Sequence, residues 1–298
     1  MKTAFAAIAL AAGAALAPAW PQDFSKVEIK TTKLAETVYM LTGAGGNIGV
    51  SAGGDTVFIV DDQYAPLTPK ISEAIAKITP KPVQFVLNTH WHGDHTGGNE
   101  NLGKQGAIIF SHENARKRLS SDQFIDLLKM KEAPSPKVAL PVVTFTDSIS
   151  FHLNGEEIRV FHVPRAHTDG DAIVHFTGSD VVHTGDVFWN GIYPFVDYSS
   201  GGSITGTIAA CDKVLAMVTD RTRIIPGHGP LGTRAELQAY RDMLATISER
   251  VRQALNEGKT DDEIVKLGLT HEYDEKWKGM KPDMFIRGIA AGMRNSGS

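Results

Sequence analysis

A short apolar run that leads directly into a cluster of histidines constrains this chain more than any other feature. Residues 83–88, Val-Gln-Phe-Val-Leu-Asn, are rich in β-branched and aromatic side chains, which predicts a buried strand. Four metal-binding side chains follow within six positions: His90, His92, Asp94 and His95. A loop at the end of a strand is where α/β proteins place their active sites.

The residue types in this loop indicate a metal site. A lone histidine beside a strand is usually a core or surface residue, but three histidines and an aspartate would leave many buried polar groups without partners, at a cost of several kcal/mol. Gly93 allows an unusual backbone angle at this place. Imidazole and carboxylate ligands without thiolate suit Zn²⁺, and also iron or manganese.

The run from His90 to His95 resembles the His-x-His-x-Asp-His signature of the metallo-β-lactamase superfamily. Three later stretches resemble the other ligand positions of that family, in the same order: 163–168 with His167, 181–186 with Asp186, and 224–229 with His228. The resemblance extends from about Val38 to His228. It implies an α/β protein, a four-layer αββα sandwich of the metallo-β-lactamase type, with a short helical C-terminal extension.

The resemblance also assigns the ligands. It gives His90, His92 and His167 to a first metal ion and Asp94, His95 and His228 to a second, with Asp186 bridging the two. Asp61 ends the apolar run 57–60 and resembles the family's aspartate that orients a metal-bound group. The alternative for Asp61 is an ordinary turn residue at the end of a strand.

Two divalent cations, with Zn²⁺ expected and iron or manganese as alternatives, define the chemistry of such a centre. Two ions carry four positive charges, and the carboxylates of Asp94 and Asp186 offset two. The remaining positive charge lowers the pKa of bound water to about 7. We therefore expect a dinuclear metal-dependent hydrolase whose metal-bridging hydroxide attacks the carbonyl of an ester, thioester, lactone or β-lactam. Asp94 is the expected catalytic residue, orienting the hydroxide or accepting its proton.

Asp186 bears on the choice of substrate. The superfamily's cysteine-containing β-lactamases carry a thiolate at this place, whereas the one cysteine here, Cys211, lies in a predicted helix. A bridging aspartate is typical of the hydroxyacylglutathione hydrolases and lactonases of the superfamily. It makes each ion a milder acid, which favours activated acyl groups, and a β-lactamase proper stays as an alternative.

Aromatic residues next to the ligands are candidates for a substrate pocket. The segment 186–197, followed by Gly-Gly-Ser at 201–203, resembles a periplasmic subgroup described as cyclase-like or quinoprotein-relay hydrolases. We expect an apolar pocket wall formed by Trp91, Phe188, Trp189, Tyr193 and Phe195. Core packing is the alternative for the last four.

Two non-hydrolytic functions stay open. A protein of this fold can be a periplasmic metal-binding or quinoprotein-relay component. It can also be an iron-dependent sulfur oxygenase with a single metal. The presence of Asp94, His95 and His228 together favours two metals over one.

The first nineteen residues resemble a signal peptide. Lys2 gives a positive start, residues 3–16 form an Ala-rich apolar run, and Ala-Pro-Ala at 17–19 provides a cleavage site. The run is shorter than the ~20 residues that span a bilayer. We expect a periplasmic or secreted protein, with a metallo-β-lactamase-fold domain at 20–232 and a helical extension at 233–298 packed on it.

The charge of the chain argues against a polyanionic partner. The formal net charge is −4, and loss of Lys2 with the leader makes it −5. The longest basic cluster, residues 116–118, lies on a predicted helix and is typical of a solvated face. We expect a small-molecule acyl substrate, no nucleic acid and no membrane anchor, and the sequence leaves the oligomeric state open.

Two series of predicted strands surround a proline-bearing stretch at 133–141. The first series is 39–41, 48–51, 57–60, 83–87 and 107–110, with a helix at 69–78; the second is 142–145, 150–153, 158–163, 172–176, 181–184 and 223–225. Capping boxes at Thr233/Glu236 and Thr260/Glu263 predict two C-terminal helices, the first of which ends at Gly258.

Overall fold

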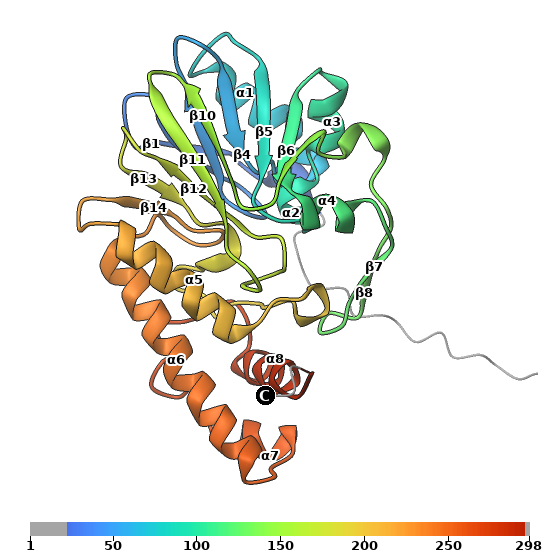
Figure 1. Ribbon diagram of the computed structural model, residues 1–298, viewed down its shortest axis with the longest axis vertical. Helices are drawn as coiled ribbons and strands as arrows, with labels where there is room; N and C mark the ends of the chain where they lie inside the picture. Colours follow the sequence, from blue (N-terminus) through green and yellow to red (C-terminus); the bar gives the residue numbers. More distant parts are fainter. Residues whose placement is uncertain (1–22, 296–298) are drawn as a thin grey trace, which may run out of the picture.

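The computed structural model describes residues 23–295, and the predicted leader lies outside this range. Two β-sheets face one another, and helices cover the outer face of each (Figure 1). The layers are therefore helix, sheet, sheet and helix. This is the αββα sandwich that the sequence predicts.

The first sheet has seven strands in the order β1-β2-β3-β4-β5-β6-β9. Their bounds are β1 Lys30–Lys33, β2 Val38–Thr42, β3 Ile48–Ala52, β4 Val57–Val60, β5 Val83–Asn88, β6 Ile108–His112 and β9 Val143–Phe145. Strands β1 to β4 are antiparallel neighbours, whereas β4, β5, β6 and β9 run parallel. The parallel strands deliver their carboxyl ends to one edge of the sandwich.

The second sheet has five strands in the order β10-β11-β12-β13-β14. Their bounds are β10 Ser148–Leu153, β11 Glu156–His162, β12 Ala172–Phe176, β13 Val181–His183 and β14 Arg223–Ile225. Only the last pair, β13 and β14, is parallel. A separate hairpin joins β7, Gln123–Ile125, to β8, Met130–Glu132.

The alternation of side chains along the strands builds three apolar layers. In β5, Leu87 faces the second sheet, whereas Val86 faces the helices outside the first sheet. In β13, Val181 faces the first sheet and Val182 faces the helices outside the second. All four side chains are fully buried, which explains why these strands read as continuous apolar runs.

Helices cover both outer faces of the sandwich. On the first sheet's side lie α1 Thr68–Ala76 and α3 Asn99–Lys104. The helices α2 Gly93–Thr96 and α4 Glu113–Leu119 follow the ends of β5 and β6. The others are α5 Ile204–Met217, α6 Arg234–Asn256, α7 Asp261–Lys266 and α8 Pro282–Asn295. Helix α4 packs in the same apolar layer as α5 and α6. Short 3₁₀ turns are η1 Phe24–Lys26, η2 Ala65–Leu67, η3 Lys137–Ala139, η4 Gly185–Val187 and η5 Tyr198–Ser200. In Figure 1, α6 lies along α5, and α8 lies below α5 and beside α6.

The C-terminal helices begin where their capping boxes predict. The Thr233 side chain accepts from the Glu236 amide and the Glu236 carboxylate accepts from the Thr233 amide; Thr260 and Glu263 repeat the arrangement in α7. Gly258, with φ of +77°, follows the end of α6. No helix within residues 23–295 combines the length and the hydropathy needed to cross a membrane.

One predicted strand lies in a different sheet from the one that its place in the sequence indicates. Residues 142–145 are predicted with the second series, but β9 pairs in parallel with β6 and forms the edge of the first sheet. The prediction is wrong because a run of three or four apolar residues indicates a strand without specifying its neighbour. The proline-bearing stretch therefore lies within the first half of the sandwich.

Candidate metal centre

Seven side chains converge at the edge of the sandwich where parallel strands end. His90 and His92 follow β5, and Asp94 and His95 lie in the short helix α2. The others come from three later elements: His167 lies between β11 and β12, Asp186 lies in η4 after β13, and His228 follows β14. The strand ends thus bring together residues that are up to 138 positions apart in the chain.

The side chains form two groups. The first contains His90, His92, His167 and Asp186, and the second contains Asp94, His95 and His228. Within each group the candidate ligand atoms lie within 4.8 Å of one another. This division matches the two sets of ligands that the resemblance implies.

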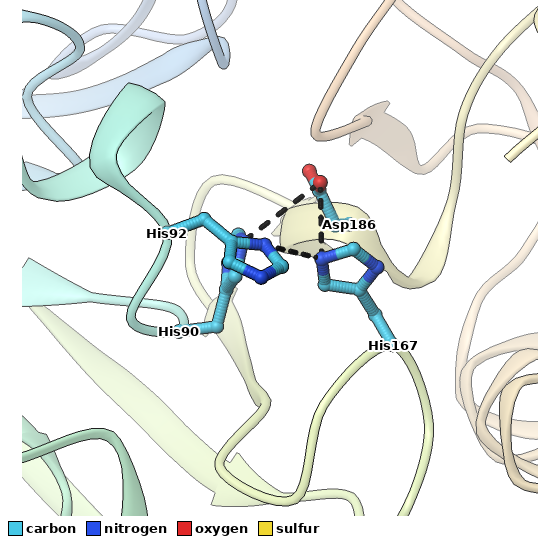
Figure 2. Close-up of side chains that lie close together, drawn as sticks. All are labelled: His90, His92, His167 and Asp186. Carbon is cyan, nitrogen blue, oxygen red and sulfur yellow. Dashed lines mark hydrogen bonds and ion pairs between the residues drawn. The ribbon is translucent and has the colours of Figure 1, made fainter. Parts of the chain in front are cut away.

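In the first group, three imidazoles surround a carboxylate (Figure 2). Oδ2 of Asp186 lies 3.8 Å from Nε2 of His90 and 3.5 Å from Nε2 of His167. Nδ1 of His92 lies 2.8 Å from Nε2 of His167. His90 and His167 therefore present Nε2 to the centre of the group, whereas His92 presents Nδ1.

In the second group, His95 and His228 face Asp94. Nε2 of His228 lies 3.3 Å from Oδ2 of Asp94 and 3.3 Å from Nε2 of His95. Asp94 has 14 % of its side-chain surface exposed, compared with at most 8 % for the other six side chains. Asp94 is therefore the most exposed member of the two groups, although most of its side chain is buried.

Asp186 lies between the groups. Its Oδ1 is 3.1 Å from Nε2 of His95, and its Oδ2 is 3.4 Å from Nε2 of His228. Since Oδ2 also faces His90 and His167, one carboxylate contacts histidines of both groups. This is the position required of a bridging ligand.

The hydrogen bonds of two histidines test whether the first group fits a cation. Nδ1 of His167 donates to the Phe195 carbonyl at 2.7 Å, and Nε2 of His92 donates to Asp197 at 3.0 Å. In a neutral imidazole, the other nitrogen is then an unprotonated acceptor. Burial lowers the pKa of His167 to about 4, so this ring is neutral. His167 therefore presents an unprotonated Nε2 to the centre of the group, 2.8 Å from Nδ1 of His92, and this lone pair is available to a metal ion.

His90 gives a second test. Its Nε2 is buried and has no hydrogen-bond partner among the described residues. Burial, reinforced by the neighbouring His95, holds the pKa of His90 well below its usual range. An unpartnered buried acceptor costs about 1–3 kcal/mol, and coordination of a cation would remove this cost.

The carboxylates remain ionised although they are buried. Burial raises the pKa of Asp94, but the charges of His95 and His228 outweigh it and lower the pKa to about 2. Burial lowers the pKa of His228, but Asp186 and Asp94 outweigh it and raise the pKa to about 9. The pKa of His95 is raised in the same way by Asp186, Asp94 and Asp61. In the absence of a cation, the positive charge beside Asp94 and Asp186 therefore comes from protons on His95 and His228.

Asp61 lies behind the two groups of candidate ligands. Its Oδ2 accepts from Nδ1 of His95 and from Oγ1 of Thr89, each at 2.8 Å, and Oγ1 of Thr89 lies 3.0 Å from Nδ1 of His90. Asp61 is fully buried and has a φ of +64°. A positive φ is uncommon for a residue other than glycine, and here it occurs at Asp61. The Asp61 carboxylate orients His95 directly and His90 through Thr89.

Asp197 is a residue that the sequence analysis does not identify. Its carboxylate is 1 % exposed at the side chain and bonds Nε2 of His92. The two residues are 105 positions apart. Asp197 ends the segment 186–197 that resembles the periplasmic subgroup, but that resemblance assigns it no role and does not indicate its pairing with His92.

The predicted pocket aromatics fall into two places. Trp91 and Trp189 lie beside the ligands, with ring centroids 4.7 Å from His92 and 4.2 Å from His228. Phe188 and Tyr193 are fully buried instead against the C-terminal helices, where Phe188 contacts Tyr240 and Tyr193 stacks on Phe285. The predicted wall is thus corrected for these two, because the apolar surface of α6 and α8 takes up their rings.

Phe195 lies closer to the ligands than Phe188 or Tyr193 does. Its ring centroid is 5.7 Å from that of His167 and 5.9 Å from that of His92. Its carbonyl also holds His167 in place. Phe195 therefore joins Trp91 and Trp189 as the aromatic surroundings of the first group.

A family comparison matches most of the chain. The model of the metallo-beta-lactamase superfamily matches residues 33–228, a range that holds all seven side chains of the two groups. The match ends at the last of them, His228, and leaves α6 to α8 outside.

Curated relatives within this superfamily have different names. The chain is 24 % identical over 216 residues to a metallo-beta-lactamase type 2 of Bacteroides fragilis, covering 69 % of this chain and 81 % of the relative. It is 25 % identical over 216 residues to a hydroxyacylglutathione hydrolase of Polaromonas sp. (strain JS666 / ATCC BAA-500), covering 71 % and 72 %. Both names denote hydrolases.

Solved structures agree on the fold. The crystal structure of the DIM-1 metallo-beta-lactamase superposes with a TM-score of 0.60 at 20 % identity, covering 74 % of this chain and 99 % of that one. At this level of identity the likeness establishes the shared architecture alone.

Proposed function

Because this chain belongs to the metallo-β-lactamase superfamily, we propose that it is a hydrolase of carbonyl compounds that works with two divalent metal ions, Zn²⁺ in the first instance. The ions would be held by His90, His92 and His167 on one side and by Asp94, His95 and His228 on the other, with Asp186 shared. The substrates would be esters, thioesters or lactones.

The position of Asp186 carries this proposal. Its two oxygens lie within 3.8 Å of Nε2 atoms of His90, His95, His167 and His228. A mononuclear oxygenase needs only one group of ligands, whereas here a second group surrounds the far side of the same carboxylate. The geometry therefore supports two ions rather than one.

Bound ions would lower the pKa of water to near 7 and polarise the acyl oxygen of a substrate. Asp94, ionised and the most exposed of the seven side chains, is placed to orient the attacking water and to accept its proton. Trp91, Trp189 and Phe195 surround the ligands with apolar surface, which limits the access of bulk water.

The charge around the centre supports activated acyl substrates. Two carboxylates, those of Asp94 and Asp186, belong to the ligand set, and they offset half of the charge of two divalent ions. Ions with these ligands are milder acids than ions held by neutral histidines alone. Thioesters, lactones and aryl esters need less activation than an ordinary amide, so we place them before β-lactams.

A substrate panel on metal-quantified protein tests the proposal. Turnover of p-nitrophenyl acetate, a γ-lactone, an acyl thioester and nitrocefin would be measured together with the metal content. We expect hydrolysis of at least one ester, lactone or thioester at a higher kcat/KM than nitrocefin. Oxygen uptake by a protein that holds a single iron, or absence of turnover across the panel, would contradict it.

A further inference from the structure

The structure assigns a role to Asp197: we propose that it is a positioning residue that sets the tautomer and orientation of His92, and through His92 the affinity of the first group for its ion. The inference deepens the metal centre proposed above and rests on it. Its evidence is the contact between a buried carboxylate and the outer nitrogen of one ligand.

Asp197 is surrounded by hydrogen-bond donors. Its Oδ2 accepts from Nε2 of His92 at 3.0 Å, and its Oδ1 accepts from the amide of Ser200 at 3.1 Å. The hydroxyls of Ser199 and Ser200 donate to Oδ1 and Oδ2 respectively. Both oxygens of the carboxylate therefore act as acceptors, and their positions are fixed by four contacts.

The contact decides which nitrogen of His92 can bind a metal. With Nε2 donating to Asp197, the lone pair of the neutral ring is on Nδ1, which lies 2.8 Å from Nε2 of His167. Without Asp197, either nitrogen of His92 could carry the proton. A fixed carboxylate behind an imidazole also increases the basicity of the nitrogen that faces the metal.

The segment that carries Asp197 also holds His167. The Phe195 carbonyl accepts from Nδ1 of His167 at 2.7 Å, and the Asp197 amide donates to the His167 carbonyl at 2.9 Å. Trp91, the neighbour of His92 in the chain, donates from Nε1 to the Ser200 hydroxyl at 3.1 Å. Residues 195–200 therefore fix two ligands of the first group that lie 75 positions apart.

Asp61 does not duplicate this role. It bonds His95 of the second group and, through Thr89, reaches His90, but its contacts do not extend to His92 or His167. The two buried carboxylates thus serve different histidines. Removal of Asp197 is expected to affect the ion of the first group and to spare that of the second.

A purely structural role has to be separated from this one, because Asp197 also caps the turn η5. Asp197→Asn keeps the shape, and asparagine is as good a cap as aspartate, but it removes the charge. Ser199→Ala is the matched control, since it removes a bond to Oδ1 and leaves the contact with His92 intact. Both variants would be checked by circular dichroism and thermal unfolding.

The experiment has two readouts that do not depend on activity. The first is the tautomer of His92 in metal-free protein by ¹⁵N NMR, assigned with His92→Ala. The second is stepwise zinc affinity by competition with a chromophoric chelator. We expect the Nε2–H tautomer in the parent protein, a roughly 10- to 100-fold weaker affinity for one ion in Asp197→Asn, and a change below about threefold in Ser199→Ala. In a His92→Ala background, Asp197→Asn should weaken binding no further.

Three results would overturn the proposal. The first is the Nδ1–H tautomer of His92 in the parent protein, and the second is parental zinc affinity at both sites in Asp197→Asn. The third is an equal loss of zinc affinity when Asp197→Asn is made in the parent protein and in the His92→Ala background. If Asp197→Asn fails to fold while Ser199→Ala folds, the tautomer of the parent protein decides alone. A parent protein that binds fewer than two ions would contradict the proposed function, and the tautomer would still test Asp197.

Discussion

Asp61 and His95 form a buried pair in which Oδ2 of the carboxylate lies 2.8 Å from Nδ1 of the imidazole. The same oxygen accepts from Thr89, so a single atom at the end of β4 orients side chains from the loop after β5. Parallel pairing of β4 with β5 brings the two strand ends together. The metal-binding loop is therefore oriented by the neighbouring strand as well as by its own sequence.

Asp61→Asn should weaken binding of the second ion by roughly 10- to 100-fold, because the amide keeps the shape of the carboxylate and loses the charge behind His95. Asparagine tolerates the left-handed backbone at this position, so the fold should be kept. Chelator competition measures the effect. Asp180→Asn is the control, since Asp180 also has a positive φ, of +53°, and bonds Thr222 far from the ligands. Equal metal affinity in the two variants would refute the role of Asp61.

Asp94→Ala should lose both the second ion and turnover. Asp94 contacts His228 and His95, so its removal leaves those two imidazoles without a carboxylate ligand of their own group. Metal analysis and the acyl panel would be run on the same preparation. A variant that is fully metallated and as active as the parent would show that Asp94 is neither ligand nor proton acceptor.

Gly227→Ala should disturb both ions. A Cβ at Gly227 would overlap Oδ1 of Asp186 and the backbone of Gly185, so Asp186 would have to move away from both groups. Gly93→Ala is the control in the other ligand loop, because a Cβ there meets nothing within 4 Å and Gly93 does not have a positive φ. We expect Gly93→Ala to keep two ions and Gly227→Ala to lose them; two ions in both variants would argue against the bridging position of Asp186.

Tyr193→Phe tests the corrected position of a predicted pocket residue. Its hydroxyl donates to Asp274 at 2.9 Å, and its ring stacks on Phe285 of α8. Loss of one such hydrogen bond should lower the free energy of unfolding by about 1 kcal/mol. KM for every substrate of the panel should stay unchanged. A selective change in KM with unaltered stability would return Tyr193 to the pocket wall.

Metal binding at neutral pH should release protons. In the metal-free protein the pKa of His228 is about 9 and that of His95 is raised well above its usual range, so both carry a proton at pH 7. An ion in the second group must displace these protons. Apparent affinity should therefore rise with pH from neutrality to about 9, the range over which His228 loses its proton. Calorimetry in buffers of different ionisation enthalpy would count the protons, and binding without release would contradict these charges.

The sequence predicts the parts of the molecule that depend on local patterns. The apolar run before His90 indicates β5, and the paired Thr and Glu residues indicate where α6 and α7 begin. These features depend on side chains a few positions apart. Their physical cause, strand alternation or a reciprocal cap, is contained in the local sequence.

The parts that the sequence does not predict depend on contacts between distant segments. Asp197 bonds His92 across 105 positions, and although both lie in segments that the sequence singles out, neither segment indicates that the two residues meet. Phe188 and Tyr193 follow a ligand closely, but the helices α6 and α8 decide which way their rings are buried. Likewise, three residues of β9 indicate a strand, while its partner β6 depends on the packing of the whole sheet.

The most direct test of the account is to count the metal ions per chain in the purified protein and to follow acyl hydrolysis while they are removed and restored. We predict two divalent ions per chain, loss of turnover on chelation, and recovery of turnover when two equivalents of Zn²⁺ are returned. A single ion per chain, or hydrolysis that continues unchanged in the presence of the chelator, would contradict the account.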